Sequence, residues 1–155
     1  MTAGDAATSQ QASAGPYDSP GFLLWRTTLR WQRSITAALR SLELTHVQFV
    51  LLAGAWWLSS APGAEARSPT QRQLAAHAQV DAMMTSQVLR ALDARGLIRR
   101  TADPTDGRVK RVTVTDTGRG LAEQAITVVE QADNDFFSNA RDPRQLLEVL
   151  SQLDR

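Results

Sequence analysis

The sequence predicts a mainly α-helical protein with one small β-hairpin, and three observations lead to that prediction. Six stretches carry apolar residues at the spacing of a helix. Between the fourth and fifth stretches the helical period is lost, and two short β-type runs flank an Asp-Pro and an Asp-Gly turn dipeptide. A length of 155 residues suits one domain with an appended helical arm, and it is enough to bury a core.

The N-terminal part of the chain changes character at residue 19. Residues 1–18 are mostly Ala, Ser, Gln, Thr and Gly without a periodic pattern, so we expect a disordered tail. This tail has no Lys or Arg, which argues against a DNA-binding arm. A first helix is predicted from Ser19-Pro20, where serine can cap and proline suits the first helical position, to about Leu42.

A second helix is predicted from about His46 to Ser59, after a capping box formed by Thr45 and Gln48. It is apolar almost all round, so we expect it to be buried on all sides. Such a helix lies either at the centre of the fold or between its own domain and a second chain. Residues 61–69 are predicted to form a loop.

Two short helices follow in close succession. Thr70 and Gln73 form a second capping box, and Asp81 is an N-cap candidate after a tight break at residues 79–80. The helix after Asp81 has one apolar face and ends at Gly96, a residue typical of the position just beyond a helix. The apolar face consists of Thr85, Val88, Leu89 and Leu92, and the opposite face of Ala82, Met83, Ser86, Gln87 and Arg90.

The period changes after Gly96. Residues 97–101 and 109–115 are predicted as two strands, joined by a long tip at residues 102–108. Helix, turn, helix and a basic hairpin together predict a winged helix-turn-helix. A helix fits the DNA major groove, and an arginine at the end of a hairpin can enter the narrower minor groove.

The hairpin also carries a resemblance. The run from Asp103 to Gly118, DPTDGRVKRVTVTDTG, is similar to the wing signature of the MarR family of bacterial transcription regulators, with Val114 where Leu is usual. Leu44-Thr45 before a helix, the helix start at Asp81, and the run from Arg95 to Ile98 match the family in order and spacing. The resemblance covers about residues 21–155. It implies a DNA-binding transcription regulator, with Arg108 as the minor-groove residue.

The two C-terminal helices are predicted from about Asp116 to Ala140, capped by Thr115, and from Asp142-Pro143 onward. They and the first helix have apolar stripes that a single winged domain cannot cover, so we expect a second copy to cover them. In proteins that resemble this one, the terminal helices interlock into a two-fold dimer. The expected organisation is a tail at 1–18, a helical dimerisation region at 19–44 and 116–155, and a winged helix-turn-helix DNA-binding domain at 45–115.

The charge is distributed unevenly although the formal net charge is only +1. Residues 61–111 hold nine Arg or Lys against five Asp or Glu, whereas residues 112–155 hold four against eight. A basic excess on the predicted helix-turn-helix and wing fits a protein that binds DNA phosphates on one side. Chance is the competing explanation for this distribution.

Side chains of the helix-turn-helix and the wing are the candidate DNA contacts. Gln can pair with adenine, Arg with guanine or phosphate, and Met can contact a thymine methyl, while a helix N-terminus attracts phosphate. The alternative is an ordinary solvated helix face, on which two exposed methionines would be unusual. The predicted DNA-binding residues are Thr70, Gln71, Arg72, Met83, Met84, Ser86, Gln87, Arg90, Arg108, Lys110 and Arg111. Arg99 and Arg100 are further phosphate candidates, one of which could pair with an acidic neighbour, and Asp106 is expected to hold the turn.

A small-molecule site is a further expectation from the resemblance, because such regulators often bind small aromatic or lipophilic anions between the dimer helices and the winged part. Aromatic walls with one cation would suit such an effector. The alternative is plain hydrophobic core, which aromatic residues at helical spacing form more often. The candidate residues are Trp25, Arg26, His46, Phe49 and Trp56.

Several other function classes have no support in the sequence. There are no cysteines, which excludes disulfide scaffolds and thiol redox sensing, and the two histidines lie on different predicted helices, so no metal site or cofactor is expected. No catalytic motif or phosphate-binding glycine loop is present, so we expect no enzyme. Neither a membrane span nor a signal peptide is visible, and a cytoplasmic location is expected.

The expected function is sequence-specific binding of double-stranded DNA as a homodimer, in transcriptional repression, with release by an effector. A dimeric winged-helix module that binds protein is the rival from another class. A small-ligand binding protein that has lost its DNA role is a third hypothesis.

Overall fold

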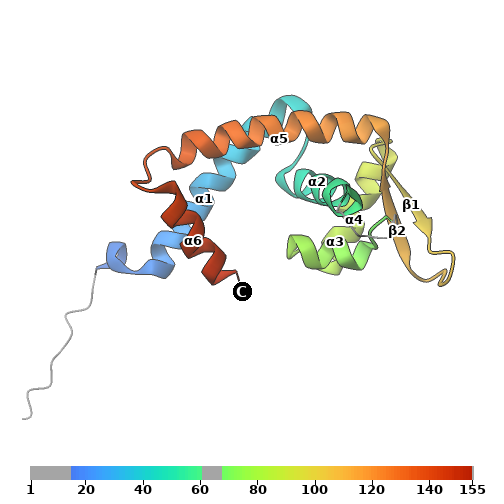
Figure 1. The fold of residues 1–155 in the computed structure, drawn as a ribbon, viewed down its shortest axis with the longest axis horizontal. Helices are drawn as coiled ribbons and strands as arrows, with labels where there is room; N and C mark the ends of the chain where they lie inside the picture. Colours follow the sequence, from blue (N-terminus) through green and yellow to red (C-terminus); the bar gives the residue numbers. More distant parts are fainter. Residues whose placement is uncertain (1–14, 61–67, 155) are drawn as a thin grey trace, which may run out of the picture.

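A computed structural model describes residues 15–60 and 68–154. It is mainly helical with one two-stranded antiparallel sheet, which confirms the predicted fold class (Figure 1). In chain order the elements are η1 (Pro16–Asp18), α1 (Pro20–Leu39), η2 (Arg40–Leu42), α2 (His46–Ser60), α3 (Gln71–Ala78), α4 (Ala82–Ala94), β1 (Ile98–Ala102), β2 (Lys110–Val114), α5 (Asp116–Phe137) and α6 (Pro143–Leu153).

The helices begin where the sequence places their caps. Ser19 Oγ accepts from the Phe22 amide at 3.4 Å, and Asp81 Oδ1 accepts from the Met84 amide at 2.8 Å. Both predicted capping boxes are present, because Thr70 and Gln73 exchange hydrogen bonds, and so do residues 45 and 48. These bonds satisfy backbone N–H groups that a helix start would otherwise leave unpaired.

The core lies where α2 meets the two short helices and the hairpin. Leu51 and Leu52 of α2 are fully buried, together with Leu74 of α3 and Leu89 of α4. Val112 closes this core from the middle of β2. Packing on α2 therefore fixes α3, α4 and the wing relative to one another.

The wing is an antiparallel pair in which Ile98 lies opposite Val114 and Ala102 opposite Lys110. The segment before α3 lines the other edge of β2: the Val112 amide donates to the Pro69 carbonyl at 2.9 Å, and Ser68 Oγ lies 2.7 Å from Thr113 Oγ1. The start of α3 is thus tied directly to the wing strand.

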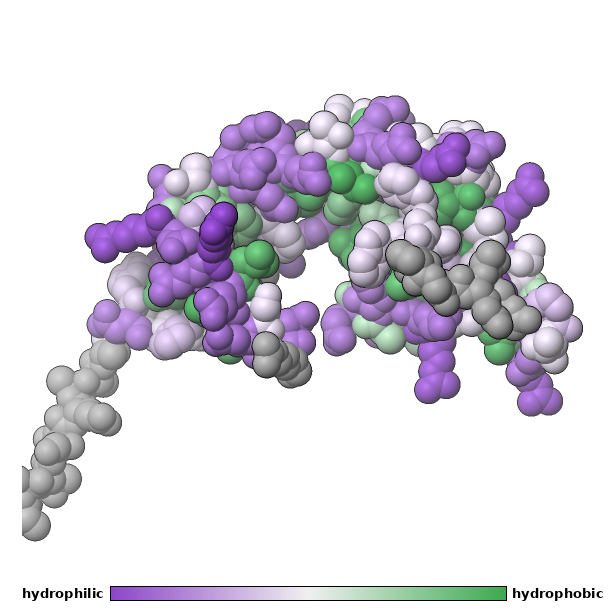
Figure 2. Space-filling model, viewed as in Figure 1, coloured by the Kyte–Doolittle hydropathy of each residue, from purple (hydrophilic) through white to green (hydrophobic). Residues whose placement is uncertain are grey.

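A second lobe is built on the other half of α5 (Figure 1). Helix α1 packs against α5, and Ile35 and Leu39 near its C-terminal end are buried. No described residue of α6 is buried, and its apolar Leu147 and Leu153 are 66% and 71% exposed. Figure 2 shows apolar side chains at the surface of this lobe. None of the helices within the described ranges is long and apolar enough to cross a membrane.

Two expectations differ from the structure. Residues 16–18, assigned to the disordered tail, form the short helix η1, while 1–14 lie outside the described residues. The helix α2 is not buried all round, because Trp57 is 65% exposed. Most of the predicted loop at 61–69 lies outside the described residues, but Pro69 is buried against β2.

Candidate nucleic-acid interface

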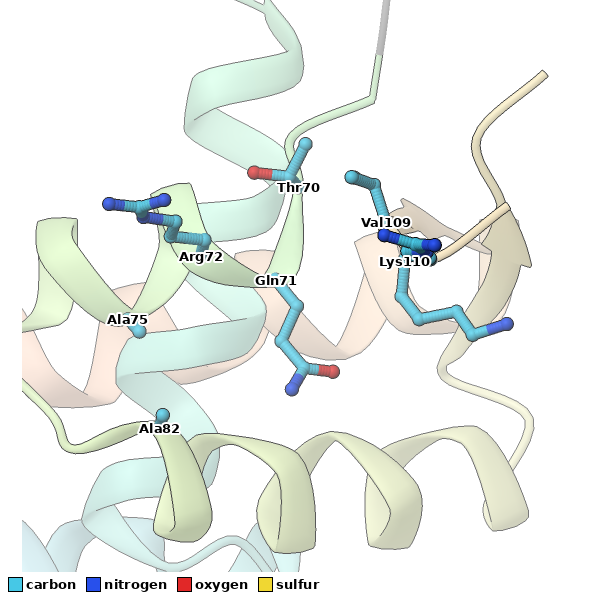
Figure 3. A pocket seen from close by; sticks show the side chains of 8 residues that line it. Thr70, Gln71, Arg72, Ala75, Ala82, Val109 and Lys110 are labelled. Atoms are coloured by element: carbon cyan, nitrogen blue, oxygen red, sulfur yellow. The ribbon is translucent and has the colours of Figure 1, made fainter. Parts of the chain in front are cut away.

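A cleft separates the start of α3 from the wing strand. It has a volume of about 460 Å³, and the first turn of α4 forms its floor. Figure 3 shows Gln71 reaching from α3 toward the space between α4 and the wing, with Lys110 on the wing side. The lining residues are Thr70, Gln71, Arg72, Ala75, Ala82, Arg108, Val109 and Lys110. Five of the predicted DNA-binding residues therefore share one concave surface.

The positive end of α3 points into this region. Its first amides are oriented by the Thr70 cap, whose Oγ1 accepts from the Gln73 amide at 3.1 Å. Thr70 therefore uses its hydroxyl for capping, as the predicted capping box requires. The exposed Arg72 adds a cation beside the same helix end, which favours an anion such as phosphate.

The outward face of α4 carries the other predicted residues. Met83 is 73% exposed and Met84 is also exposed, although both are apolar. Gln87 is exposed on the same face, and Arg90 Nε donates to the Ser86 carbonyl at 3.3 Å. The inward face buries Thr85, Leu89 and Leu92, as the periodicity predicted, so the outward side chains remain available to a partner.

Asp103 organises the wing tip and was not among the predicted site residues. It is only 6% exposed, and its Oδ1 accepts from the Thr105 amide at 2.8 Å, the Thr105 hydroxyl at 2.5 Å and the Asp106 amide at 3.2 Å. These hydrogen bonds hold the pKa of Asp103 well below its usual range, and the Arg111 guanidinium contributes in the same direction. The sequence signal was present, because aspartate before Pro-Thr-Asp is typical of a side-chain-capped turn.

Arg111, predicted as a phosphate contact, makes its described contacts within the protein. Its Nε pairs with the Asp103 carboxylate, and its Nη1 donates to the Ser68 carbonyl at 2.7 Å. The guanidinium is therefore turned into the protein, where it ties β2 to the wing tip and to the segment before α3. A phosphate contact from Arg111 is not supported by this geometry.

The remaining cations of the hairpin divide into paired and exposed groups. Arg100 Nε lies 3.9 Å from an Asp93 carboxylate oxygen, so one of the two arginines of β1 does pair with an acidic neighbour. Asp106 holds the turn as expected, since its Oδ1 accepts from the Arg108 amide at 3.0 Å. The side chains of Arg108 and Lys110 are exposed.

The predicted effector residues do not form one site in this chain. Phe49 and Trp56 line the same pocket, whereas Trp25 is exposed on α1. Arg26 lies over the rings of Tyr17 and Phe22, at 5.0 and 5.7 Å from their centroids. The periodicity of one helix predicts a shared face but not which neighbouring helix that face meets.

His46 is likewise placed elsewhere. Its ring packs edge-on against Trp31 at 5.1 Å between centroids, and Trp31 Nε1 donates to Asp133 Oδ1 at 2.7 Å. Burial lowers the pKa of His46, and the nearby Asp133 carboxylate opposes that shift. This arrangement joins α1, α2 and α5 and does not line the pocket of Phe49 and Trp56.

The pocket that Phe49 and Trp56 do line lies between α2, α3 and α5. It has a volume of about 510 Å³. None of the other lining residues was among the predicted effector residues; they are Val50, Ala53, Gly54, Trp57, Ser60, His77 and Ile126. Within residues 15–60 and 68–154, no group of three or more His, Asp or Glu residues is placed to hold a metal ion.

Comparisons with known proteins agree on one family. The model of the MarR family matches residues 44–110. A helix-turn-helix transcriptional regulator of Bacillus subtilis, YdcH, is 39% identical over 140 residues, which cover 90% of this chain and 92% of that protein. The transcriptional repressor Rv2887 of Mycobacterium tuberculosis is 36% identical, over 83% of this chain and 87% of its own.

Solved structures give the same result. The structure of CouR from Rhodococcus jostii bound to p-coumaroyl-CoA superposes with a TM-score of 0.77 at 27% identity, covering 91% of this chain and 92% of that one. The complex of Rv2887 with salicylic acid superposes with a TM-score of 0.64 at 34% identity, covering 87% of this chain and 96% of the other.

Proposed function

The chain belongs to the MarR family of transcriptional regulators, and on that premise we propose that it represses transcription as a homodimer bound to a pseudo-palindromic operator. One observation carries the proposal. The N-terminus of α4, the start of α3 and the basic side of the wing meet around a single cleft. A phosphate-binding helix end beside a polar recognition face is the arrangement that docking into a major groove requires.

In this proposal α4 enters the major groove, where Gln87 reads a base edge and Met83 contacts an apolar base surface. The N-terminus of α3 and the side chains of Arg72 and Lys110 bind backbone phosphates. Arg108 reaches the flanking minor groove from the wing tip, where the negative potential is concentrated. Arg111 is left out, because its guanidinium already binds Asp103.

Residues 19–44 and 116–155 form the proposed dimerisation region, and residues 45–115 the DNA-binding domain. The apolar faces of α1 and α6 support this division, since one chain leaves them exposed. A two-fold dimer would set its two α4 helices into successive major grooves, roughly 34–36 Å apart.

Repression is favoured because Rv2887, a relative over most of the chain, is a repressor. CouR and Rv2887 bind aromatic compounds, so we further propose that an aromatic effector releases this chain from DNA by favouring a dimer of the wrong half-site spacing. Regulators of this family are generally not enzymes, and no catalytic role is proposed. We propose a cytoplasmic location, because a regulator that binds operator DNA works at the chromosome.

Fluorescence anisotropy tests the proposal with labelled fragments of the gene's own upstream region, a scrambled duplex and two salt concentrations. Tight binding to one fragment, one dimer per site and a steep salt dependence are expected, with a slope of roughly 0.9 per phosphate contact. Arg108→Ala should weaken binding without changing the dimer or its thermal stability. Arg119→Ala is the matched control, because it removes an exposed charge from the first turn of α5.

Two outcomes would contradict parts of the proposal. Equal affinity of Arg108→Ala and the parent protein would remove the wing tip from DNA recognition. Weak binding to every duplex of a genome-wide selection, with little salt dependence, would favour the rival function, a winged-helix module that binds protein.

A further inference from the structure

The sulfur atoms of this protein are concentrated on one helix. The chain has three methionines and no cysteine. Within residues 15–60 and 68–154, Met83 and Met84 are therefore the only residues that carry sulfur. Both lie in the first turn of α4, the helix that the proposed function places in the major groove. The oxidisable sulfur of the described residues thus lies on the helix that reads DNA.

The side chains of both methionines are open to solvent. Met83 is 73% exposed and Met84 is 44% exposed, although methionine is among the residue types most often buried. The proposed dimerisation region, residues 19–44 and 116–155, does not include α4. An oxidant in solution therefore reaches both thioethers in the DNA-free protein.

A hydroperoxide oxidises an exposed thioether by transferring one oxygen atom. With hydrogen peroxide, the sulfur lone pair attacks one oxygen, the O–O bond breaks and an S–O bond forms. The proton of the transferred oxygen moves to the other oxygen, which leaves as water. Sulfur is oxidised by two electrons and the peroxide is reduced by two. The product, methionine sulfoxide, carries a polar S=O group where the thioether was apolar.

A sulfoxide at Met83 changes what α4 presents to DNA. The apolar contact with a base is replaced by a polar group, and burying that group in the groove without a donor is unfavourable. Gln87 lies one turn further along the same face of the helix, at position i+4 from Met83. The sulfoxide oxygen is therefore an acceptor beside the Gln87 amide, where it competes with a base for the same donor.

The fold itself does not depend on either thioether. The group of Met84 that caps α4 is its backbone amide, which donates to Asp81 Oδ1 at 2.8 Å. Neither methionine belongs to the buried core. Oxidation should therefore change the DNA-binding surface and leave the melting temperature of the protein unchanged.

We propose that Met83 and Met84 form an oxidation-sensitive site, at which a hydroperoxide converts the thioethers to sulfoxides and weakens operator binding. The site is part of the face of α4 that reads DNA, so the inference rests on the proposed function. Methionine sulfoxide reductases reverse this modification, so the affinity for DNA returns once the sulfoxides are reduced.

The test treats the full chain with hydrogen peroxide and measures its affinity for the operator fragment by fluorescence anisotropy. Trypsin releases residues 73–90 as one peptide that contains both methionines, and mass spectrometry of this peptide counts the oxygen atoms added. Complete oxidation of the peptide should weaken binding about tenfold, the effect of burying one unsatisfied polar group. Treatment with methionine sulfoxide reductases should restore the affinity. Unchanged affinity after complete oxidation overturns the inference.

The double variant Met83→Leu/Met84→Leu shows where the effect originates. It removes both sulfur atoms of α4 and keeps every other oxidisable side chain, including Met1 and the four tryptophans. Each protein is compared with itself before and after peroxide, so a change in the starting affinity of the variant does not enter. Peroxide should leave the affinity of the variant unchanged. A loss as large as in the parent protein would place the sensitive group elsewhere and overturn the inference.

Protection by DNA is a second measurement that does not depend on affinity after oxidation. Operator DNA at saturation should slow the oxidation of Met83, because the groove covers its thioether, and a scrambled duplex should slow it less. Peptide fragmentation distinguishes Met83 from Met84. Equal rates with and without the operator would mean that DNA does not cover Met83, which contradicts the inference.

The untreated protein separates this inference from the proposed function. A chain that binds its operator equally well before and after complete oxidation keeps the proposed function and loses the inference. A chain that binds no duplex even before treatment loses both, because there is then no DNA contact for a sulfoxide to disturb.

Discussion

Asp103 is buried although it bears a carboxylate, and the wing tip is built around it. The Thr105 and Asp106 amides donate to its Oδ1, while the Arg111 guanidinium pairs with its other oxygen. These partners come from the turn itself and from β2, so the carboxylate closes the tip onto the strand. The same turn holds the backbone at Arg108, because the Asp106 side chain accepts from the Arg108 amide.

Asp103→Asn is therefore expected to lower the melting temperature at neutral pH. The folded-state pKa of Asp103 lies well below the ordinary value of about 3.9, so the unfolded chain binds the proton first as the pH falls. The stability that the carboxylate supplies is present above about pH 4 and is lost as the pH falls toward the folded-state pKa. Thermal unfolding should show a difference between parent and variant that is constant near neutrality and shrinks below about pH 4.

Asp93→Asn is the control for this experiment, because the Asp93 carboxylate is more exposed than that of Asp103. Its distance of 3.9 Å from Arg100 Nε is also long for an ion pair. This variant should change the melting temperature little at any pH, as expected of an exposed pair. A difference for Asp103→Asn that does not change with pH would show that its charge is not what holds the tip.

Gly118 fills a position that no other residue can occupy. A Cβ there would lie 1.9 Å from the Leu97 carbonyl oxygen and 2.8 Å from its carbon, both of them backbone atoms. Gly118→Ala should separate α5 from the wing and destabilise the protein by about 2 kcal/mol or more. Gly120→Ala, on the same helix with nothing within 4 Å, should instead stabilise it by about 0.4–1 kcal/mol. Urea unfolding of the two variants measures both changes in the free energy of unfolding. Equal changes would contradict a close contact between Gly118 and the Leu97 backbone.

At the scale of the elements, the helix starts were the most predictable feature. The capping boxes at Thr45 and Thr70 and the Asp81 cap depend on residues three positions apart, so the local sequence contains all the information they need. The buried face of α4 was predictable for a related reason, since a single helical period determines it.

Contacts between elements were less predictable. Arg111 looks like a phosphate ligand in a basic strand, but its partners are Asp103 at the tip and the Ser68 carbonyl before α3. The effector residues were predicted as one group, yet only Phe49 and Trp56 share a pocket, and His77 reaches it from another helix. Such pairings depend on how helices cross, which the period of any one helix does not determine.

The outward face of α4 carries a residue that we expect to determine which DNA sequence is bound. Gln87 is exposed and has no described hydrogen bond within the chain, so its amide is available to a base. Gln87→Ala should relax the preference at one base pair of each half-site by about 1–3 kcal/mol. Anisotropy against a set of single-base operator variants measures this change. A uniform loss of affinity across the set would assign Gln87 to the phosphate backbone instead.

At the scale of the whole molecule, α5 joins the winged core to a second lobe that contains α1 and α6. Its first half packs on the winged core, and its second half packs along α1. The lobe of α1 and α6 leaves Leu23, Leu24, Trp25, Leu147, Leu150 and Leu153 exposed, and no described residue of α6 is buried. Exposed apolar faces of this extent on terminal helices require a partner, and a second copy presents the same faces.

Leu150→Glu should therefore convert the protein to a monomer, because it places a carboxylate on the apolar face of α6. Gln152→Glu introduces the same charge on the polar face of that helix and should leave the dimer intact. Sedimentation velocity distinguishes the two states directly. Since each half-site would then bind alone, the Leu150→Glu monomer should also lose most of its operator affinity while keeping its helical circular dichroism. A dimer that survives Leu150→Glu would show that α6 lies outside the interface, and the exposed face of α1 would then have to supply the contact.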